Sequence, residues 1–131
     1  MNIYIVRHGE TEWNTTWRLQ GRTDISLNDT GIKQAQLTAK ALKAEGIVFD
    51  RVYSSPLSRA LKTAEILSGF SPEKIIKENR IIEINFGNAE GSTPQERKTN
   101  PKFKQINNFF NAPALYNPSA DAESFKQVFA R

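Results

Sequence analysis

The sequence contains no cysteine and only one histidine, His8, among its 131 residues. The lack of cysteine excludes disulfide bonds and thiolate metal sites. With a single histidine and no carboxylates at the spacing of metal ligands, neither a metal nor another cofactor is expected. No segment approaches about eighteen consecutive apolar residues, and the N-terminus lacks the regions of a signal peptide. We therefore expect no membrane association and a cytoplasmic location.

The composition is that of one ordinary globular domain. Hydrophobic residues make up 38% of the chain and charged residues 24%, which are typical values for a protein long enough to bury a core. The formal net charge is +4, which raises the question of a nucleic-acid partner. The basic residues are scattered singly, without a dense Lys/Arg run or an aromatic–basic repeat, so none is expected. A positive pocket for a small phosphorylated substrate explains the same charge.

Hydrophobic patterning predicts that strands and helices alternate along the chain. The short β-branched run of residues 3–6, stopped by Gly9, is typical of a parallel strand covered on both faces. Two more strands are predicted at residues 51–54 and 75–82. Helical spacing and capping residues predict helices over residues 28–46, 57–69, 93–100, 102–110 and from residue 125 onward. This order indicates an α/β fold with a largely parallel sheet and crossover helices.

Chemistry is expected first at the end of the predicted strand of residues 3–6. Arg7 and His8 follow this strand directly, and ligands of open α/β sheets bind outside the carboxyl ends of the strands. A neutral imidazole attacks phosphorus readily, and a guanidinium binds two phosphate oxygens at once. An Arg-His-Gly string is a weak motif by itself, so the interpretation depends on the surrounding segments.

Four segments, in order, resemble the histidine phosphatase superfamily (branch 1), the phosphoglycerate mutase-like proteins. Arg7-His8-Gly9-Glu10-Thr11-Glu12-Trp13-Asn14 matches the opening signature of that family. Residues 20–35 resemble its loop and first helix, residues 52–64 its second strand, and residues 83–91 the loop with its general acid. The resemblance covers residues 1–97 and returns at Ala122-Glu123-Ser124-Phe125. It implies a three-layer α/β/α fold with a mostly parallel sheet.

The resemblance also implies a role for eight residues. The catalytic ones are His8, as the nucleophile that becomes phosphohistidine, and Glu83, as the general acid. The others would bind the phosphate (Arg7, Arg59 and Asn14) or the rest of the substrate (Thr11, Gln20 and Gly21). The implied function is that of a phosphomonoester hydrolase acting on a small phosphorylated metabolite. The alternatives are a phosphoglycerate mutase and a non-catalytic phosphate-binding fragment.

The residues themselves leave some of these roles open. Arg59 could pair with a surface carboxylate instead of a phosphate. Glu83 could be an ordinary loop carboxylate, with Glu90 as the neighbouring candidate for the general acid and Glu10 as a more distant one. Ala89 stands where many members of the family have tryptophan, which bears on packing around the substrate.

The family continues into a strand with a second active-site histidine, which this sequence lacks. We therefore expect a single domain over residues 1–131 that is incomplete at its C-terminus, with residues 92–121 as a lid or insertion. The final helix should be either docked or frayed, because so short a helix is marginal by itself. The missing strand would leave residues 2–6 at an open edge of the sheet. Poor stability or self-association through this edge is expected.

Overall fold

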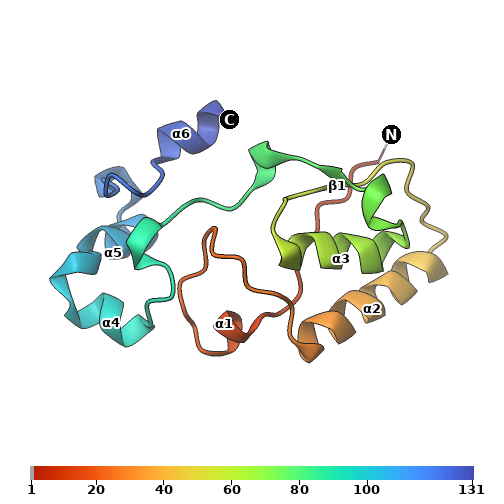
Figure 1. The fold of residues 1–131 in the computed structure, drawn as a ribbon, viewed down its shortest axis with the longest axis horizontal. Coiled ribbons are helices and arrows are strands. Elements are labelled where there is room, and N and C mark those ends of the chain that lie inside the picture. The colour runs from red at the N-terminus through yellow and green to blue at the C-terminus, as the bar shows by residue number, and fades with distance from the viewer. Residues whose placement is uncertain (1) are drawn as a thin grey trace. The chain divides into compact units, whose positions relative to one another are not determined.

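The computed structural model describes residues 2–131 (Figure 1). They form two compact units, each described separately below. The first unit holds the residues up to Glu12 together with Asp24–Ile81, and the second holds Trp13–Thr23 and Ile82–Arg131. The expected single domain with residues 92–121 as a lid stays a prediction. Among the described residues, no helix has both the length and the apolar character needed to cross a bilayer.

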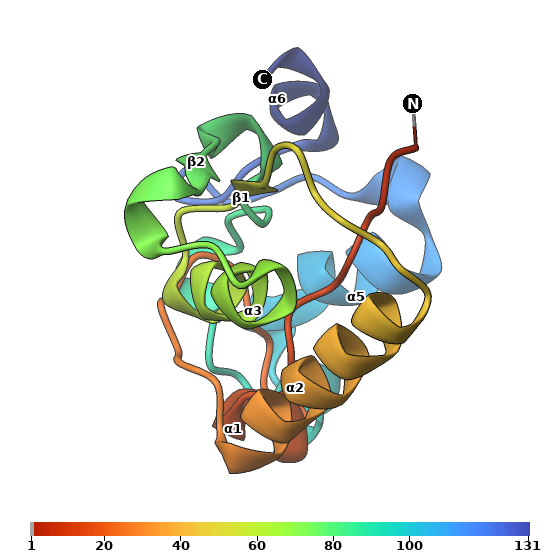
Figure 2. The same ribbon diagram turned by 90° about the vertical axis from the view of Figure 1, so that its right-hand side faces the viewer.

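Two packed helices, α2 (Asp29–Ala44) and α3 (Ser58–Ser68), form the frame of the first unit (Figure 2). Helix α2 begins where the Asn28 side chain accepts a hydrogen bond from the Gly31 amide at 2.8 Å. Helix α3 ends at Gly69, which has a positive φ of 70° that suits glycine. Both predicted helices are confirmed, because their capping signals are local in sequence.

The sheet of the first unit consists of two parallel strands, β1 (Tyr53–Ser54) and β2 (Ile76–Lys77), with helix α3 between them in the chain. The Ile76 amide donates to Val52 and the Glu78 amide to Ser54. The parallel crossover is confirmed, but the strand predicted to run from 75 to 82 is too long. After β2 the Glu78 carboxylate accepts from the amide and the guanidinium of Arg80, which turns the chain.

Residues 3–6 do not form the predicted strand (Figure 2). All four side chains are exposed, and Ile5 exposes 95% of its surface. A strand needs a neighbour with which to exchange backbone hydrogen bonds, and no ladder forms along residues 3–6 in the described chain. Tyr4 contacts the ring of Phe49, with 5.8 Å between centroids. The prediction of a strand covered on both faces is therefore wrong, and an apolar segment remains exposed.

The second unit is helical. Helix α1 (Glu12–Thr15) leads into it, followed by α4 (Pro94–Thr99), α5 (Lys104–Asn111) and α6 (Phe125–Ala130). The predicted capping box of Thr93 and Glu96 is confirmed, and Ser124 with Gln127 forms a second one. Short 3-10 turns connect elements of both units, at Pro72–Lys74, Asn79–Ile81, Gly87–Ala89, Pro101–Phe103 and Pro113–Leu115.

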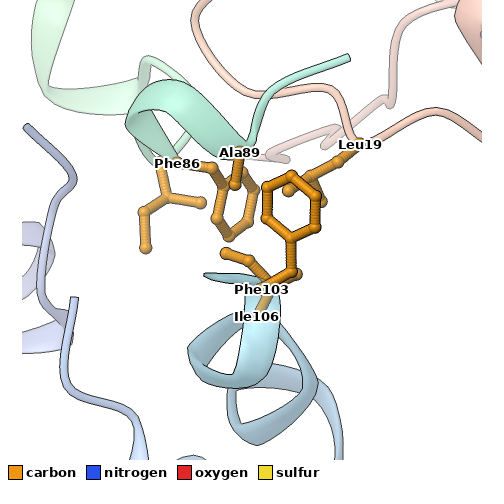
Figure 3. Packing of buried hydrophobic residues seen from close by; sticks show 6 residues of the cluster. Leu19, Phe86, Ala89, Phe103 and Ile106 are labelled. Atoms are coloured by element: carbon orange, nitrogen blue, oxygen red, sulfur yellow. The ribbon is translucent and has the colours of Figure 1, made fainter. Parts of the chain in front are cut away.

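An apolar cluster holds the second unit together (Figure 3). Its buried members are Leu19, Ile84, Phe86, Ala89, Phe103 and Ile106. Phe109 of α5 packs against this cluster, with its ring 4.9 Å from Phe86 and stacked on Phe125 at 5.1 Å. Val128 also contacts the cluster, so helix α6 is docked. The same cluster fixes the segment after Glu83, because Ile84 and Phe86 are two of its members.

Candidate active site

The eight predicted site residues divide between the two units. Arg7, His8, Thr11 and Arg59 belong to the first unit, and Asn14, Gln20, Gly21 and Glu83 belong to the second. Within each unit, hydrogen bonds fix the segments that carry these residues. That all eight act in one site stays a prediction.

His8 is half-buried, and its Nδ1 atom lies 2.7 Å from the carbonyl oxygen of Gly9. A carbonyl oxygen only accepts hydrogen bonds, so this contact assigns the proton to Nδ1. In the neutral ring the lone pair is then on Nε2. The hydrogen bond therefore selects Nε2 as the nitrogen that can attack a phosphorus atom.

A buried threonine links the His8 loop to Arg59. Arg59 is only 1% exposed and lies in the first turn of α3. One turn later, the Thr63 hydroxyl donates to the Arg59 carbonyl oxygen at 2.7 Å. The same hydroxyl accepts from the Gly9 amide at 3.1 Å. The residue after the nucleophile is thus bound to the helical turn that carries the second predicted phosphate-binding arginine.

Asp24 fixes the start of that helix. The residue before α3, Leu57, makes no side-chain capping bond. Instead, one Asp24 oxygen accepts from both the amide and the hydroxyl of Ser58, each at 2.8 Å. A carboxylate at a helix N-terminus pairs with the exposed amides and with the positive end of the helix dipole. Asp24 thereby holds the turn in which Arg59 lies.

The His8 loop also packs directly on the start of α2. A Cβ atom at Gly9 would lie 2.5 Å from the carbonyl oxygen of Gly31, so no larger residue fits without a shift. The Glu10 amide donates to Gln34 at 3.0 Å, and the Glu10 carboxylate accepts from Asn28 at 2.9 Å. This contact gives Glu10 a structural task at the cap of α2.

In the second unit, Glu83 directly precedes the buried part of its segment. Its side chain is exposed, and its Oε1 atom accepts a hydrogen bond from the Ile84 amide at 2.9 Å. The Glu83 carbonyl oxygen accepts from Nε of Arg22 at 3.1 Å. Both the carboxylate and the peptide group of Glu83 therefore have defined partners.

Glu90, the alternative general acid, is bound on several sides. Its carboxylate accepts from the amides of Arg22 at 2.8 Å, Thr23 at 2.6 Å and Phe86 at 3.1 Å, and from the Thr23 hydroxyl. Burial by itself would raise the pKa of Glu90, but the hydrogen bonds from Thr23, Arg22 and Phe86 together lower it below its ordinary value. A carboxyl group with a lowered pKa is a poor proton donor at neutral pH. This argues against Glu90 as the acid.

Two of the substrate-binding candidates, Gln20 and Gly21, lie on the loop whose backbone Glu90 binds at Arg22 and Thr23, whereas Thr11 is fully buried in the first unit. Gly21 is buried, and a Cβ atom there would overlap the Glu90 carboxylate. Gln20 follows Leu19, whose amide donates to Ser92 at 2.9 Å and whose carbonyl accepts from Gly91 at 2.8 Å. Gly91 itself faces the Trp13 ring, which would lie 3.1 Å from a Cβ atom. The glycines at both positions allow close packing.

Sequence reasoning did not identify Thr63, Asp24 or Arg22. The Thr63 bond to Gly9 spans 54 residues of sequence and the Asp24 bond to Ser58 spans 34. No local pattern indicates such contacts. Helical spacing could have placed Thr63 on the same face of α3 as Arg59, because residues four apart share a face.

Comparison with known proteins places these residues in a family. The model of the histidine phosphatase superfamily (branch 1) matches residues 3–131. The chain is 41% identical over 95 residues to the uncharacterized phosphatase PhoE of Bacillus subtilis, which covers 72% of this chain and 48% of PhoE. It is 38% identical over 107 residues to the probable phosphoglycerate mutase GpmB of Photorhabdus laumondii, with 78% of this chain and 49% of GpmB covered.

A solved structure has a similar fold. The YhfR protein of Bacillus stearothermophilus superposes with a TM-score of 0.79 at 38% identity, over 93% of this chain and 58% of YhfR. This likeness confirms the predicted α/β, phosphoglycerate mutase-like fold class. The chain spans about half the length of the curated relatives that it matches.

Proposed function

Because the chain belongs to branch 1 of the histidine phosphatase superfamily, we propose that it acts in the hydrolysis of a small phosphorylated metabolite through a phosphohistidine at His8. The observation that carries this proposal is the hydrogen bond between His8 Nδ1 and Gly9, which leaves the lone pair on Nε2. The link from the same loop through Thr63 to Arg59 supports it.

In the proposed reaction, Nε2 of His8 attacks the phosphorus atom and the bond to the alcohol oxygen breaks. Arg7 and Arg59 neutralise the phosphoryl oxygens, whose charge is spread over the transition state. Glu83 gives its proton to the departing alkoxide. Water then attacks the phosphorus atom of the phosphohistidine while the Glu83 carboxylate takes its proton, and the bond from phosphorus to Nε2 breaks to release phosphate and restore His8. Neutral groups would line the pocket, namely Asn14, Thr11, Gln20 and Gly21.

A phosphoglycerate mutase is the second candidate. The probable mutase among the relatives favours it. In that reaction the phosphohistidine would return its phosphoryl group to a second hydroxyl of the substrate and not to water. The products discriminate the two candidates: a phosphatase releases inorganic phosphate, whereas a mutase forms an isomeric phosphoglycerate. A chain that binds phosphate without either product would be the non-catalytic module.

The phosphohistidine itself is the sharpest test. The chain is incubated with p-nitrophenyl phosphate, quenched in base and examined by ³¹P NMR for an acid-labile phosphoramidate. Because the chain has only one histidine, a phosphohistidine signal belongs to His8 and should be removed by His8→Asn, whereas a phosphoramidate on lysine or arginine would remain. The matched control Lys40→Asn introduces an asparagine at an exposed position of the same unit and should retain the signal. No signal from the unaltered chain, or an equal one from His8→Asn, would refute the proposed function.

We also propose that copies of this chain self-associate through residues 3–6, the segment expected at the open edge of the incomplete sheet. Supporting this, these four apolar residues are exposed and Ile5 is 95% exposed, and exposed apolar segments mark interaction sites. Sedimentation at several concentrations should show association that Ile5→Lys abolishes. Leu115→Lys, at a 68% exposed position of the second unit, is the control that should still associate. A concentration-independent monomer would contradict this.

For location we propose the cytoplasm. The support is the proposed substrate class, because ionised phosphate esters do not cross an apolar barrier without cost and stay where they are made. Separating cytoplasmic from extracytoplasmic fractions and probing each with an antibody against the chain would test the location.

A further inference from the structure

Arg22 contacts the proposed general acid through the backbone and not through the carboxylate. Its Nε donates to the Glu83 carbonyl oxygen at 3.1 Å, and its Nη2 donates to Glu123 Oε1 at 2.9 Å. Nε and Nη2 form one edge of the planar guanidinium, so the two bonds fix the orientation of that plane. The Arg22 amide adds a third anchor, to Glu90 at 2.8 Å.

Glu123 holds the other side of the same segment. Its amide donates to the Asn85 carbonyl at 2.8 Å, and its Oε2 accepts from the Asn85 amide at 3.3 Å. Arg131 pairs with both carboxylate oxygens, at 3.0 and 3.3 Å. The Glu123 side chain is 11% exposed, so this group of charges is largely shielded from solvent. The backbone of residues 83–85 is thus held by Arg22 and Glu123 together.

The peptide group between Glu83 and Ile84 connects these contacts to the acid. Its carbonyl oxygen accepts from Arg22, and its N–H donates to Oε1 of Glu83 at 2.9 Å. Because a peptide group is planar, fixing its carbonyl also fixes the direction of its N–H. Ile84 is buried in the apolar cluster. The Glu83–Ile84 peptide plane therefore stays in place even when the Glu83 side chain moves.

We propose that Arg22 is a positioning residue for Glu83: it fixes the Glu83–Ile84 peptide plane, and this plane holds the carboxylate in place for proton transfer. The effect of Arg22 on the rate of proton transfer rests on the proposed function, whereas its effect on the orientation of the Glu83 carboxylate does not. Glu123 supports Arg22 as its ionised partner. A misplaced acid slows reactions with poor leaving groups most, because good leaving groups depart without a proton.

The geometric part is tested on the full 131-residue chain by NMR of the Ile84 amide as pH is lowered. Protonation of Glu83 should shift this amide, and Glu83→Ala, which removes the acceptor, should abolish the shift. Arg22→Ala should abolish most of the shift as well. The matched control is Arg18→Ala, because Arg18 also donates to a backbone carbonyl in the same unit, that of Gly91 at 2.9 Å. This control should keep the full shift.

If Arg22→Ala does not give a folded spectrum, Arg22→Lys is interpreted in its place. Lysine keeps a positive charge for Glu123 but has no planar edge with two parallel donors, so most of the Ile84 shift should again be lost. A folded Arg22 variant with an undiminished pH-dependent shift would overturn the positioning role.

The catalytic part is tested with two substrates of different leaving group. On an alkyl phosphate, Arg22→Ala should lower kcat about tenfold or more, a fraction of the full general-acid effect, with little change in KM. On p-nitrophenyl phosphate, kcat should change by less than about threefold because little protonation is needed. An equal loss on both substrates would indicate a merely structural role and would overturn the inference.

Failure of the proposed function has a different signature. If Glu83→Ala affects both substrates equally, or if no phosphohistidine forms at His8, the proposed chemistry is refuted. The Ile84 amide shift still decides in that case whether Arg22 orients the Glu83 carboxylate.

Discussion

The loop after His8 in the first unit is held mainly by neutral side chains, whereas the loop after Glu83 in the second unit is held by ionised ones. Thr63 and Gln34 bind the backbone of residues 9 and 10. Glu90, Glu123 and Arg22 bind the backbone of residues 83–86. Neutral hydrogen bonds do not titrate, whereas a carboxylate loses its negative charge and part of its acceptor capacity on protonation. Acid should therefore act first on the segment that carries the proposed proton donor.

The units differ in their apolar packing as well. The second unit has an aromatic cluster in which Phe109 contacts four other rings, those of Phe86, Phe110, Tyr116 and Phe125. In the first unit, the apolar residues 3–6 are exposed. Segments with few buried contacts open at low free-energy cost. We therefore expect the nucleophile's unit to be the less protected one.

The largest expected effect is on stability. Phe86 is 4% exposed and Ile5 is 95% exposed, so Phe86→Ala should lower the free energy of unfolding by about 3–5 kcal/mol. At a concentration at which the chain is monomeric, Ile5→Ala should change it by less than about 0.5 kcal/mol. Denaturant unfolding of both variants measures this difference. Similar losses for both would show that residues 3–6 are buried in solution and would remove the contrast in packing.

Anion binding should show the next largest effect. Arg7→Ala combined with Arg59→Ala should weaken phosphate or vanadate binding about a hundredfold. Removing a hydrogen-bond donor from a negatively charged oxygen typically has an effect of this order. Calorimetric titration measures the affinity. Arg51→Ala, an exposed arginine of the same unit, is the control for net charge. Equal affinity in the double variant and the unaltered chain would exclude a phosphate site at these arginines.

Thr63→Val should have an intermediate effect. Valine has a similar size but leaves the Gly9 amide without its acceptor, which costs about 1–3 kcal/mol for a buried donor. Thr63→Ser keeps the hydroxyl and should retain most of the stability. Amide hydrogen exchange at Gly9 provides the local measurement. Unchanged exchange in Thr63→Val would mean that the Gly9 hydrogen bond is not formed in solution.

The smallest effect concerns pH. Hydrogen bonds lower the pKa of Glu90 in the folded chain, so its contribution is present above the ordinary glutamate pKa and is lost as pH falls through the lowered one. Glu90→Gln should make the free energy of unfolding less dependent on pH in this acidic range, by chemical denaturation at a series of pH values. Glu45→Gln, at an exposed position of the first unit, is the control for the removal of one carboxylate. An identical acid dependence in Glu90→Gln would show that other groups carry it.

The sequence predicts helices better than it predicts the sheet, for a physical reason. Asn28 and Thr93 satisfy the first amides of their own helices, so the signal and the structure lie within a few residues. The run of residues 3–6 has the composition of a strand, but a strand exists only through a partner. Its failure to pair could not be derived from those residues alone.

The candidate site shows the same limit. Short motifs identified His8, Arg59 and Glu83, because each motif lies on one segment. The contact between Arg22 and Glu123 spans 101 residues, and no periodicity or capping rule indicates it. The lowered pKa of Glu90 also required the structure, since Glu83 and Glu90 are both loop carboxylates in the sequence.

The close packing of Trp13 on Gly91 provides an optical probe of the second unit. The chain contains two tryptophans, and Trp17 is 76% exposed, so Trp17→Phe would leave Trp13 as the sole indole emitter. Its fluorescence would then change when the segment of residues 84–91 separates from residue 13, with no label attached. Stopped-flow dilution into denaturant would follow this separation in real time.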